Sequence, residues 1–309
     1  MNLRNLVNLK RAVSSMLEAR AIRLHRSRVG WRIAPRYTRY LERCRRESPL
    51  ESKAVAPVAA AVETFRKDGI TAFQTETSAA VARTMAARME DRETRGEKVW
   101  GPISAEGYET YAGDVWLDFP ELEELFRKDL GDFLNGYFKA PFKILYGILY
   151  RTRHVEGPHG SQLWHSDSGP GICVNVMYYL HDTTLDNGPL EALPWDVSHR
   201  MFRKEKRLVW TGGLERFGKE KRDRLCNFYE NEISPQYRST IRQPFGPVGL
   251  VVPFLNNTIH RGGYPAPGYT RTALVFHCYP SHQPTDFARY RQLGVKKTIP
   301  YPQDPAATF

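Results

Sequence analysis

The segment Gln162-Leu-Trp-His-Ser-Asp167 places a histidine and an aspartate two residues apart, ahead of an apolar run over residues 173–180. Such a run is typical of a buried strand. On an extended chain, residues i and i+2 point to the same face. We therefore expect His165 and Asp167 to project side by side, into a space that the rest of the fold must complete.

A third metal ligand is expected far downstream, at His260 in the segment Asn257-Thr-Ile-His-Arg-Gly-Gly263. Two histidines and one carboxylate on one face, with open positions opposite, are the arrangement of non-haem Fe(II) oxygenases. The pattern thus predicts His165, Asp167 and His260 as metal ligands and as the catalytic centre. The alternative is an ordinary hydrogen-bonded pair of His165 and Asp167 in a protein core.

Arg271 follows His260 by eleven residues and opens the run Arg271-Thr-Ala-Leu-Val-Phe-His277. Ala273, Val275 and His277 are its same-face neighbours on a strand. A guanidinium beside apolar neighbours calls for an anion, and a carboxylate suits its fork of donors. The alternative is a surface salt bridge.

Other histidines compete for the role of ligand. His159 is the nearest alternative to His165, but Pro158 and Gly160 place it in a turn. His181 and His199 are expected to make structural hydrogen bonds, and His277 to line the pocket without binding the metal.

The positive charge of the chain is unevenly distributed. Residues 1–50 hold 13 Lys and Arg against 3 Glu, whereas the remainder holds 32 basic and 31 acidic residues. A near-neutral body offers no basic groove, so no nucleic-acid partner is expected. The four cysteines have no paired spacing, which argues against a disulfide framework and fits a reducing, cytoplasmic setting.

The first 50 residues form a basic arm with helical spacing of apolar residues over 3–29. Three interpretations stay open. The helix could pack on the body, residues 1–30 could contact an anionic membrane surface, or the segment could be an organelle-targeting presequence. No apolar run of the sequence approaches the length of a membrane span.

The remaining pattern is α-rich in the first half and strand-rich from residue 142. Residues 47–57 resemble a linker, 69–73 a short strand, and 90–115 a loop. Helices are expected over 58–65, 78–89 with Ser78 as N-cap, and 119–137. Strands are expected over 142–150, 173–180, 248–254 and 270–279, with a turn at Asp186-Asn-Gly188. This order indicates a β-sandwich or small barrel flanked by helices.

Several of these segments resemble the phytanoyl-CoA dioxygenase family. Gln162-Leu-Trp-His-Ser-Asp167 is similar to the family's metal motif, and His260-Arg-Gly-Gly with Arg271 resembles its distal ligand and co-substrate clamp. The segments 67–73 and 179–190 also resemble family segments. Pro194-Trp-Asp-Val-Ser-His199 is similar to the family's Pro-Gly-Ser-His, with Trp195 and Asp196 replacing a compact turn. The likeness spans residues 60 to 282.

The resemblance implies a mixed, mainly β fold: a double-stranded β-helix (a cupin-like jelly roll) flanked by N-terminal helices. It implies an oxygenase domain over 58–285 with a lid-like insertion at 200–242, between the arm and a tail over 286–309. It implies Fe(II) held by His165, Asp167 and His260, 2-oxoglutarate bound to the iron and to Arg271, and O2 as co-substrate. The products would be succinate, CO2 and an oxidised, usually hydroxylated, substrate. Asp167 stands where related halogenases have a small residue.

Other co-substrate contacts are expected around this centre. A Ser or Thr two residues after the clamp arginine is common in such oxygenases, but this chain has Ala273. Hydroxyls of Tyr146, Tyr150 or Thr258 could substitute. We assign Asn175 to the keto-acid carboxylate and include Gln162 among the co-substrate contacts.

The substrate is expected to be a small or medium organic molecule, such as a natural product, sugar or acyl conjugate. Residues 200–224 hold 10 Lys and Arg against 4 acidic residues, which favours an anionic or carrier-bound substrate under a lid. The alternative for the insertion is a solvated charged helix. The alternative function is a non-catalytic peripheral protein that docks on a membrane or polyanion through its arm, and a nucleic-acid-modifying oxygenase ranks last.

Overall fold

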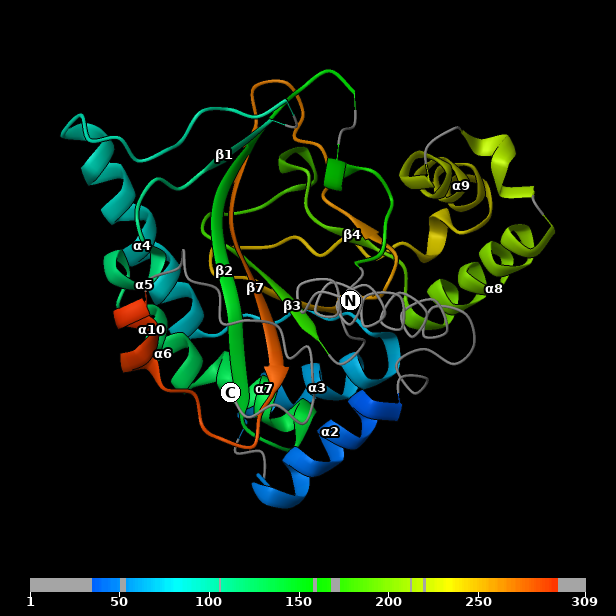
Figure 1. Cartoon of the computed structure of the whole chain (residues 1–309). Helices are drawn as coiled ribbons and strands as arrows, with labels where there is room; N and C mark the ends of the chain where they lie inside the picture. The colour runs from blue at the N-terminus through cyan, green and yellow to red at the C-terminus, as the bar shows by residue number, and fades with distance from the viewer. Residues whose placement is uncertain are drawn as a thin grey trace, which may run out of the picture.

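The computed structural model describes residues 35–50, 54–105, 107–157, 160–167, 173–211, 213–218 and 221–293. A five-stranded antiparallel sheet runs through its middle (Figure 1). In spatial order, its strands are β1 (Tyr108–Thr110), β2 (Phe142–Arg153), β7 (Thr270–Pro280), β3 (Val174–Tyr179) and β5 (Val251–Leu255). The long β2 and β7 pair along almost their whole length.

A second, smaller sheet consists of β4 (Glu191–Ala192) and β6 (His260–Arg261). Single bridges from His165 to His260 and from Ala192 to Arg242 extend it on both sides. Segments far apart in the chain therefore meet here. Together the two antiparallel sheets and the flanking helices confirm the predicted fold class.

The large sheet buries both of its faces. Along β7, Leu274, Phe276 and Cys278 join the main core under the helices, and along β3 Val174, Val176 and Tyr178 do the same. The alternate residues, which include Asn175, Arg271 and Ala273, are buried on the opposite face. This alternation follows from the two-residue period of a strand. It directs Arg271 and its same-face neighbours away from the helical core.

Helices cover the face of the large sheet that carries Leu274, Phe276 and Cys278. They are α3 (Ala56–Asp68), α4 (Glu76–Thr94), α5 (Val115–Asp118), α6 (Leu122–Arg127), α7 (Asp129–Phe138) and α10 (Phe287–Leu293). Figure 1 shows α4, α5, α6 and α10 gathered on one side of β2 and β7. Aromatic rings fill the interface, as where Phe126 meets Phe276 with ring centroids 4.8 Å apart.

The expected strands at 142–150, 173–180, 248–254 and 270–279 are confirmed, with shifted ends. Three smaller predictions were wrong. The N-cap of α4 is Thr75, and Ser78 completes its capping box from the third helical position. Residues 69–73 form only isolated bridges to β5 at Ile70 and Phe73, and part of the expected loop at 90–115 is β1 and the end of α4.

The prediction of a single helix over 119–137 was also wrong. The helix is interrupted at Lys128, which lies between α6 and α7. At this break the backbone of Gly131 packs against Phe126. A Cβ on Gly131 would lie 1.9 Å from the Phe126 carbonyl oxygen. The local sequence has helical propensity throughout, and the tight turn is a tertiary feature that only glycine admits here.

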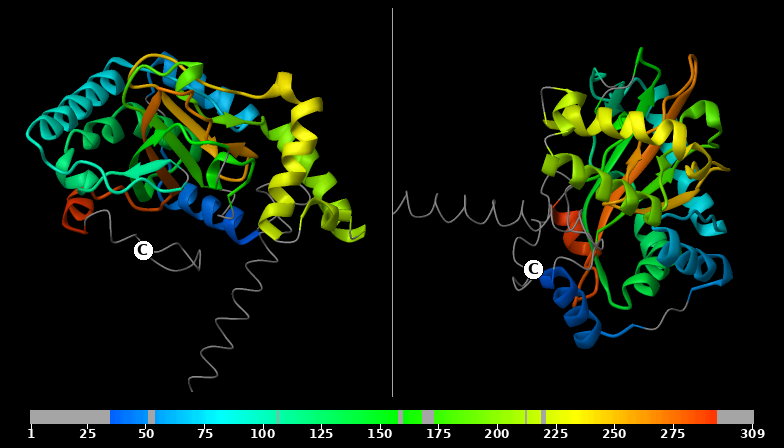
Figure 2. Two further views of the ribbon diagram at one scale, coloured as in Figure 1. Left: turned by 90° about the horizontal axis from the view of Figure 1, so that it is seen from above. Right: turned by 90° about the vertical axis from the view of Figure 1, so that its right-hand side faces the viewer.

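The segment expected to be a lid forms a separate helical pair, α8 (Trp195–Thr211) and α9 (Lys221–Gln236). Both views of Figure 2 show the two helices side by side, outside the large sheet. Their apolar residues make a second core with Trp164 and Ile259, which precede His165 and His260 in the chain. The helical pair therefore supports the two metal-motif segments from behind.

Helix α2 (Pro35–Glu47) belongs to the expected basic arm and packs on the body. Tyr40, Leu41 and Cys44 are buried in the main core, and the Tyr40 hydroxyl donates to the Pro280 carbonyl at 3.1 Å. The helix expected over 3–29 lies outside the described residues. Within the described part of the chain, no helix combines the length and apolar character that crossing a membrane requires.

Candidate metal centre and co-substrate pocket

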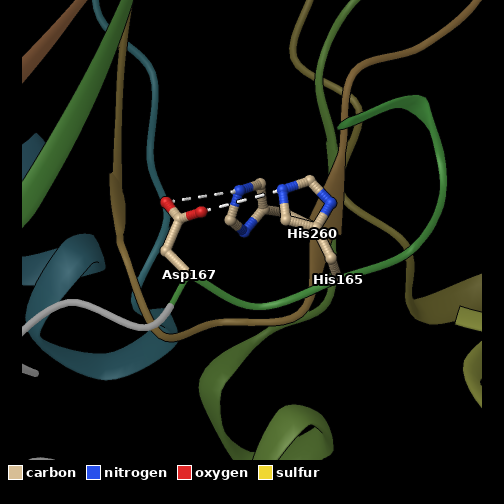
Figure 3. Close-up of side chains that lie close together, drawn as sticks. All are labelled: His165, Asp167 and His260. Carbon is tan, nitrogen blue, oxygen red and sulfur yellow. Dashed lines mark ion pairs between the residues drawn. The ribbon is translucent and has the colours of Figure 1, made fainter. Parts of the chain in front are cut away.

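His165, Asp167 and His260 converge on one point (Figure 3). One ligand atom from each lies within 4.8 Å of the others. The Asp167 carboxylate faces both rings, with Nε2 of His165 at 3.7 Å from Oδ1 and Nε2 of His260 at 3.8 Å from Oδ2. These separations are too long for hydrogen bonds. The three groups therefore gather around a common space that could hold a metal ion.

Both imidazoles are held in the tautomer that a metal ligand needs. Nδ1 of His165 lies 2.7 Å from the Leu163 carbonyl oxygen, and Nδ1 of His260 lies 2.9 Å from that of Thr258. A carbonyl only accepts, so each Nδ1 must carry the proton. With the proton on Nδ1, each ring can offer the lone pair of Nε2 toward Asp167, as metal-bound histidines do when their other nitrogen donates.

The backbone fixes the relative position of the ligands. His165 and His260 exchange both amide-to-carbonyl bonds, at 2.9 and 2.8 Å, and the Asp167 amide donates to the Asn256 carbonyl at 3.0 Å. The extended strand expected for His165 and Asp167 is reduced to this one bridge. Their side chains share a face because the bridge, rather than a long strand, aligns them.

Asn175 on β3 orients the carboxylate. Its Nδ2 donates to Asp167 Oδ2 at 2.6 Å. Burial alone would raise the pKa of Asp167, but the positive charge that the imidazoles of His260, His165 and His277 carry in the acidic range where a carboxyl titrates, together with the bond from Asn175, holds this pKa below its usual value. The carboxylate is thus ionised and aimed at the space that it shares with the two rings.

Arg271 is fully buried on the inner face of β7, with 0% of its surface exposed. Its Nη1 donates to the Gly263 carbonyl at 3.2 Å and its Nη2 to the Thr152 hydroxyl at 3.4 Å, while Nε has no partner. Among the residues that the structure describes, no carboxylate lies within 4 Å of this guanidinium. A buried cation with these neutral partners alone is costly unless an anion joins it.

A cavity of about 370 Å³ adjoins these groups. The three predicted ligands line it, together with Asn175, Tyr150 and His277 from the large sheet. Burial lowers the pKa of His277 to about 4, so this ring is neutral at physiological pH. The cavity also includes Gly262, where a Cβ would come within 3.3 Å of Arg271 Nη2. The guanidinium therefore lies at the edge of the cavity, beside Gly262.

The other expected contacts lie in different places. Gln162 is buried, and its carbonyl accepts from the Tyr264 hydroxyl, but it is not among the described lining residues. The Thr258 hydroxyl donates to the Leu255 carbonyl within its own turn. His181 accepts from the Thr272 amide and is structural, as expected. His159 and the side chain of Tyr146 lie outside the described residues.

Sequence reasoning missed three hydroxyl groups. Thr152 pairs with Arg271 across β2 and β7, and the strand register could have indicated it once β2 was extended to residue 153. Tyr108 and Ser161 line the cavity, with their hydroxyls 2.7 Å apart. Tyr108 lies on β1, in a stretch expected to be loop, and the sequence carries no signal for it.

No family model matches the chain, and no curated protein matches it. Solved structures with similar folds include the non-haem α-ketoglutarate-dependent carbocyclase SnoK from nogalamycin biosynthesis, at 18% identity over 74% of this chain and 86% of that chain, with a TM-score of 0.49. EctD from S. alaskensis with 2-oxoglutarate and 5-hydroxyectoine is 18% identical over 75% and 79%, with a TM-score of 0.47. HygX from Streptomyces hygroscopicus with nickel and 2-oxoglutarate is 14% identical over 72% and 87%, with a TM-score of 0.44. At these identities the similarity concerns the fold.

Proposed function

We propose that the protein is an Fe(II)- and 2-oxoglutarate-dependent oxygenase. The observation that carries this proposal is that one cavity has three metal-ligating side chains and, next to it, a buried guanidinium. A dianionic co-substrate such as 2-oxoglutarate needs both. His165, Asp167 and His260 present three ligand atoms on one side. Buried Arg271 lies beside Gly262 with no carboxylate partner among the described residues. A 2-keto diacid would reach the metal at one end and the guanidinium at the other.

Each residue has a distinct role in this proposal. The two histidines and Asp167 would hold Fe(II) and leave positions open for co-substrate and O2. Bound iron would supply the O2 chemistry that couples conversion of 2-oxoglutarate to succinate and CO2 with oxidation of the substrate. Arg271 would hold the distal carboxylate through its fork of donors. Asn175 would keep Asp167 aligned, and its place in the cavity also allows the predicted contact with the keto-acid carboxylate.

The finer assignments extend this proposal. From the motifs we infer that the chain is a member of the phytanoyl-CoA dioxygenase family. We also infer that it is cytoplasmic and that it hydroxylates, or otherwise oxidises, a natural product, sugar or acyl conjugate. The lining of the cavity is largely aromatic and aliphatic, with Tyr150, Met177 and Phe254 among its members. None of the described lining residues comes from the basic insertion, so an anionic part of a substrate would have to lie outside the cavity.

Anaerobic titration with Fe(II) and then 2-oxoglutarate tests the proposal. The wild-type chain should develop the weak visible charge-transfer band of a keto acid bound to Fe(II). His260→Ala should abolish the band. Arg271→Met keeps an unbranched side chain in the buried site but removes the charge. It should weaken the binding of 2-oxoglutarate by about 100-fold, as loss of a buried charged hydrogen-bond donor does.

Arg242→Met is the matched control. Arg242 is bridged to Ala192 of the small sheet, and its side chain is half-exposed. It should leave both affinities unchanged. Well-folded wild-type protein that binds Fe(II) without any band on addition of 2-oxoglutarate would overturn the proposal. So would equal 2-oxoglutarate affinities for wild type and Arg271→Met.

A further inference from the structure

We propose that the protein has a second ligand site, separate from the metal centre, for a phosphate ester with an apolar body. A cavity of about 370 Å³ is lined by residues of α2, α3 and α7. Figure 1 shows these three helices next to one another in the lower part of the molecule. The first turn of α8 and the end of β5 complete its wall through Trp195 and Leu255. It shares no described lining residue with the metal-centre cavity.

Three cations line this second cavity: Arg45 on α2, Arg66 on α3 and Lys139 at the end of α7. No acidic residue is among its described lining residues. Arg66 pairs with Glu63 on its own helix, and Glu63 is largely exposed. Within the described ranges, no carboxylate lies within 4 Å of Arg45 or Lys139. Of the three cations at this cavity, only Arg66 therefore has a counter-charge within 4 Å among the described residues, and that carboxylate is not among the described lining residues.

Helix capping explains only part of this arrangement. Arg45 Nε donates to the Phe138 carbonyl at 2.8 Å, and Arg66 Nη2 donates to the Gly136 carbonyl at 2.7 Å, so both arginines satisfy carbonyls at the end of α7. A guanidinium has five N–H donors, and these bonds use one from each. Burial and, to a smaller extent, the charge of Arg66 lower the pKa of Arg45. An anion between the two guanidinia would relieve this effect.

The apolar wall indicates what kind of anion fits. Leu41, Phe65, Trp195 and Leu255 supply aliphatic and aromatic surface next to the three cations. Inorganic phosphate would leave this surface uncovered, whereas an uncharged apolar molecule would leave the cations unpaired. A phosphate ester satisfies both, because its dianionic head suits a cluster of cations and its body removes apolar area from water.

Calorimetric titration of the full chain with 1-naphthyl phosphate tests the proposal, with Mn(II) and 2-oxoglutarate present to fill the metal-centre cavity. We expect 1-naphthyl phosphate to bind about tenfold or more tightly than either inorganic phosphate or 1-naphthol, since each fragment forfeits one class of contact. The double variant Arg45→Gln with Arg66→Gln should weaken the ester at least about tenfold. Arg46→Gln with Arg83→Gln removes the same charge from exposed positions of α2 and α4 and should change the affinity less than about twofold.

Lys139→Gly is a second variant that we expect to fold normally, so that a loss of ester binding cannot be attributed to unfolding. Lys139 has a φ of 54°, in the left-handed region that glycine adopts more readily than lysine. The substitution should therefore leave the melting temperature unchanged or raise it. It should weaken the binding of 1-naphthyl phosphate about fivefold, because one cation is lost. Unchanged affinity in Lys139→Gly and in the double variant would overturn the proposal. Absence of binding at millimolar ester, or displacement of the ester by 2-oxoglutarate, would overturn it as well.

Discussion

At the scale of single residues, the candidate centre depends on where each proton and each charge is held. Short bonds from the two Nδ1 atoms to carbonyls two residues earlier in the chain direct both Nε2 atoms toward Asp167. The same i to i−2 geometry occurs at His165 and His260, although their sequences differ. Asn175 then fixes the third ligand, Asp167, from a different sheet.

Replacing Asn175 tests this orienting role. Asn175→Ala removes the 2.6 Å bond to Asp167 and should weaken Fe(II) binding about 10- to 100-fold, as loss of a partner behind a metal ligand does. Anaerobic Fe(II) titration measures the change. Asn231→Ala, at an exposed position of α9, is the matched control and should bind Fe(II) like wild type. An unchanged Fe(II) affinity in Asn175→Ala would show that Asp167 needs no such support.

Gly262 lies where the cavity meets the guanidinium of Arg271. A Cβ at Gly262 would lie 3.3 Å from both Arg271 Nη2 and the Tyr108 hydroxyl. Gly262→Ala should therefore weaken 2-oxoglutarate about tenfold, since overpacking by one methyl costs about 1–3 kcal/mol, and should spare Fe(II) binding. Stepwise titration with metal and then 2-oxoglutarate separates the two effects. Gly246→Ala, where the new methyl would make only ordinary contact with Leu250, is the control.

At the scale of elements, two glycine-containing segments hold the end of β7 that carries Arg271. Gly188 ends the short turn η3 (Leu185–Asn187) with a φ of 64°, and a Cβ on Gly263 would lie 2.3 Å from the Pro189 carbonyl oxygen. Asn187 also donates to the Thr270 carbonyl at 2.8 Å. The turn predicted at Asp186-Asn-Gly188 thus packs against the segment after His260 and is hydrogen-bonded to the start of β7.

The break between α6 and α7 gives a prediction about stability. Gly131→Ala would place a methyl 1.9 Å from the Phe126 carbonyl oxygen, so the two helices must separate. We expect a loss of about 3 kcal/mol in the free energy of unfolding, at the upper end for an overpacked site. Gly96→Ala, with a φ of 73° and open space around it, should cost about 1 kcal/mol from backbone strain alone. Urea unfolding of both variants measures the difference, and equal losses would contradict this account of the break.

At the scale of the whole molecule, three bodies of structure have separate tasks. The two sheets enclose the candidate centre, the helices α3 to α7 and α10 cover the outer face of the large sheet, and α8 with α9 buttresses the two metal-motif segments. Helix α2 packs on the core, which places the second cavity between the start of the described chain and the body.

The basic arm gives a prediction at this scale. A chain beginning at Pro35 keeps α2 and every described residue of both cavities. It should bind Fe(II) and 2-oxoglutarate like the full chain, but lose salt-dependent sedimentation with phosphatidylserine vesicles, because eight of the arm's basic residues precede residue 35. Phosphatidylcholine vesicles are the control. Equal sedimentation of the two chains would remove the membrane role proposed for residues 1–30.

Two parts of the proposed centre could be predicted from short-range spacing: the pair His165 and Asp167, and Arg271 on its strand. His260 lies far from that pair, and its prediction depended on its place eleven residues before Arg271 and on the family resemblance. His165 and Asp167 are two residues apart, and the alternation along 271–277 assigns Arg271 and His277 to one face. Four of the five strands of the large sheet, all but β1, were predictable for the same reason, since strand composition and a period of two are local properties.

Only the tertiary structure decided which distant groups meet. The bridge of His165 to His260, the bond of Asn175 to Asp167 and the contact of Thr152 with Arg271 all join segments whose separation in the chain carries no periodic signal. The break at Lys128 and the cations around the second cavity are likewise results of packing. Local patterns determine which face a side chain occupies, whereas long-range contacts determine what lies across from it.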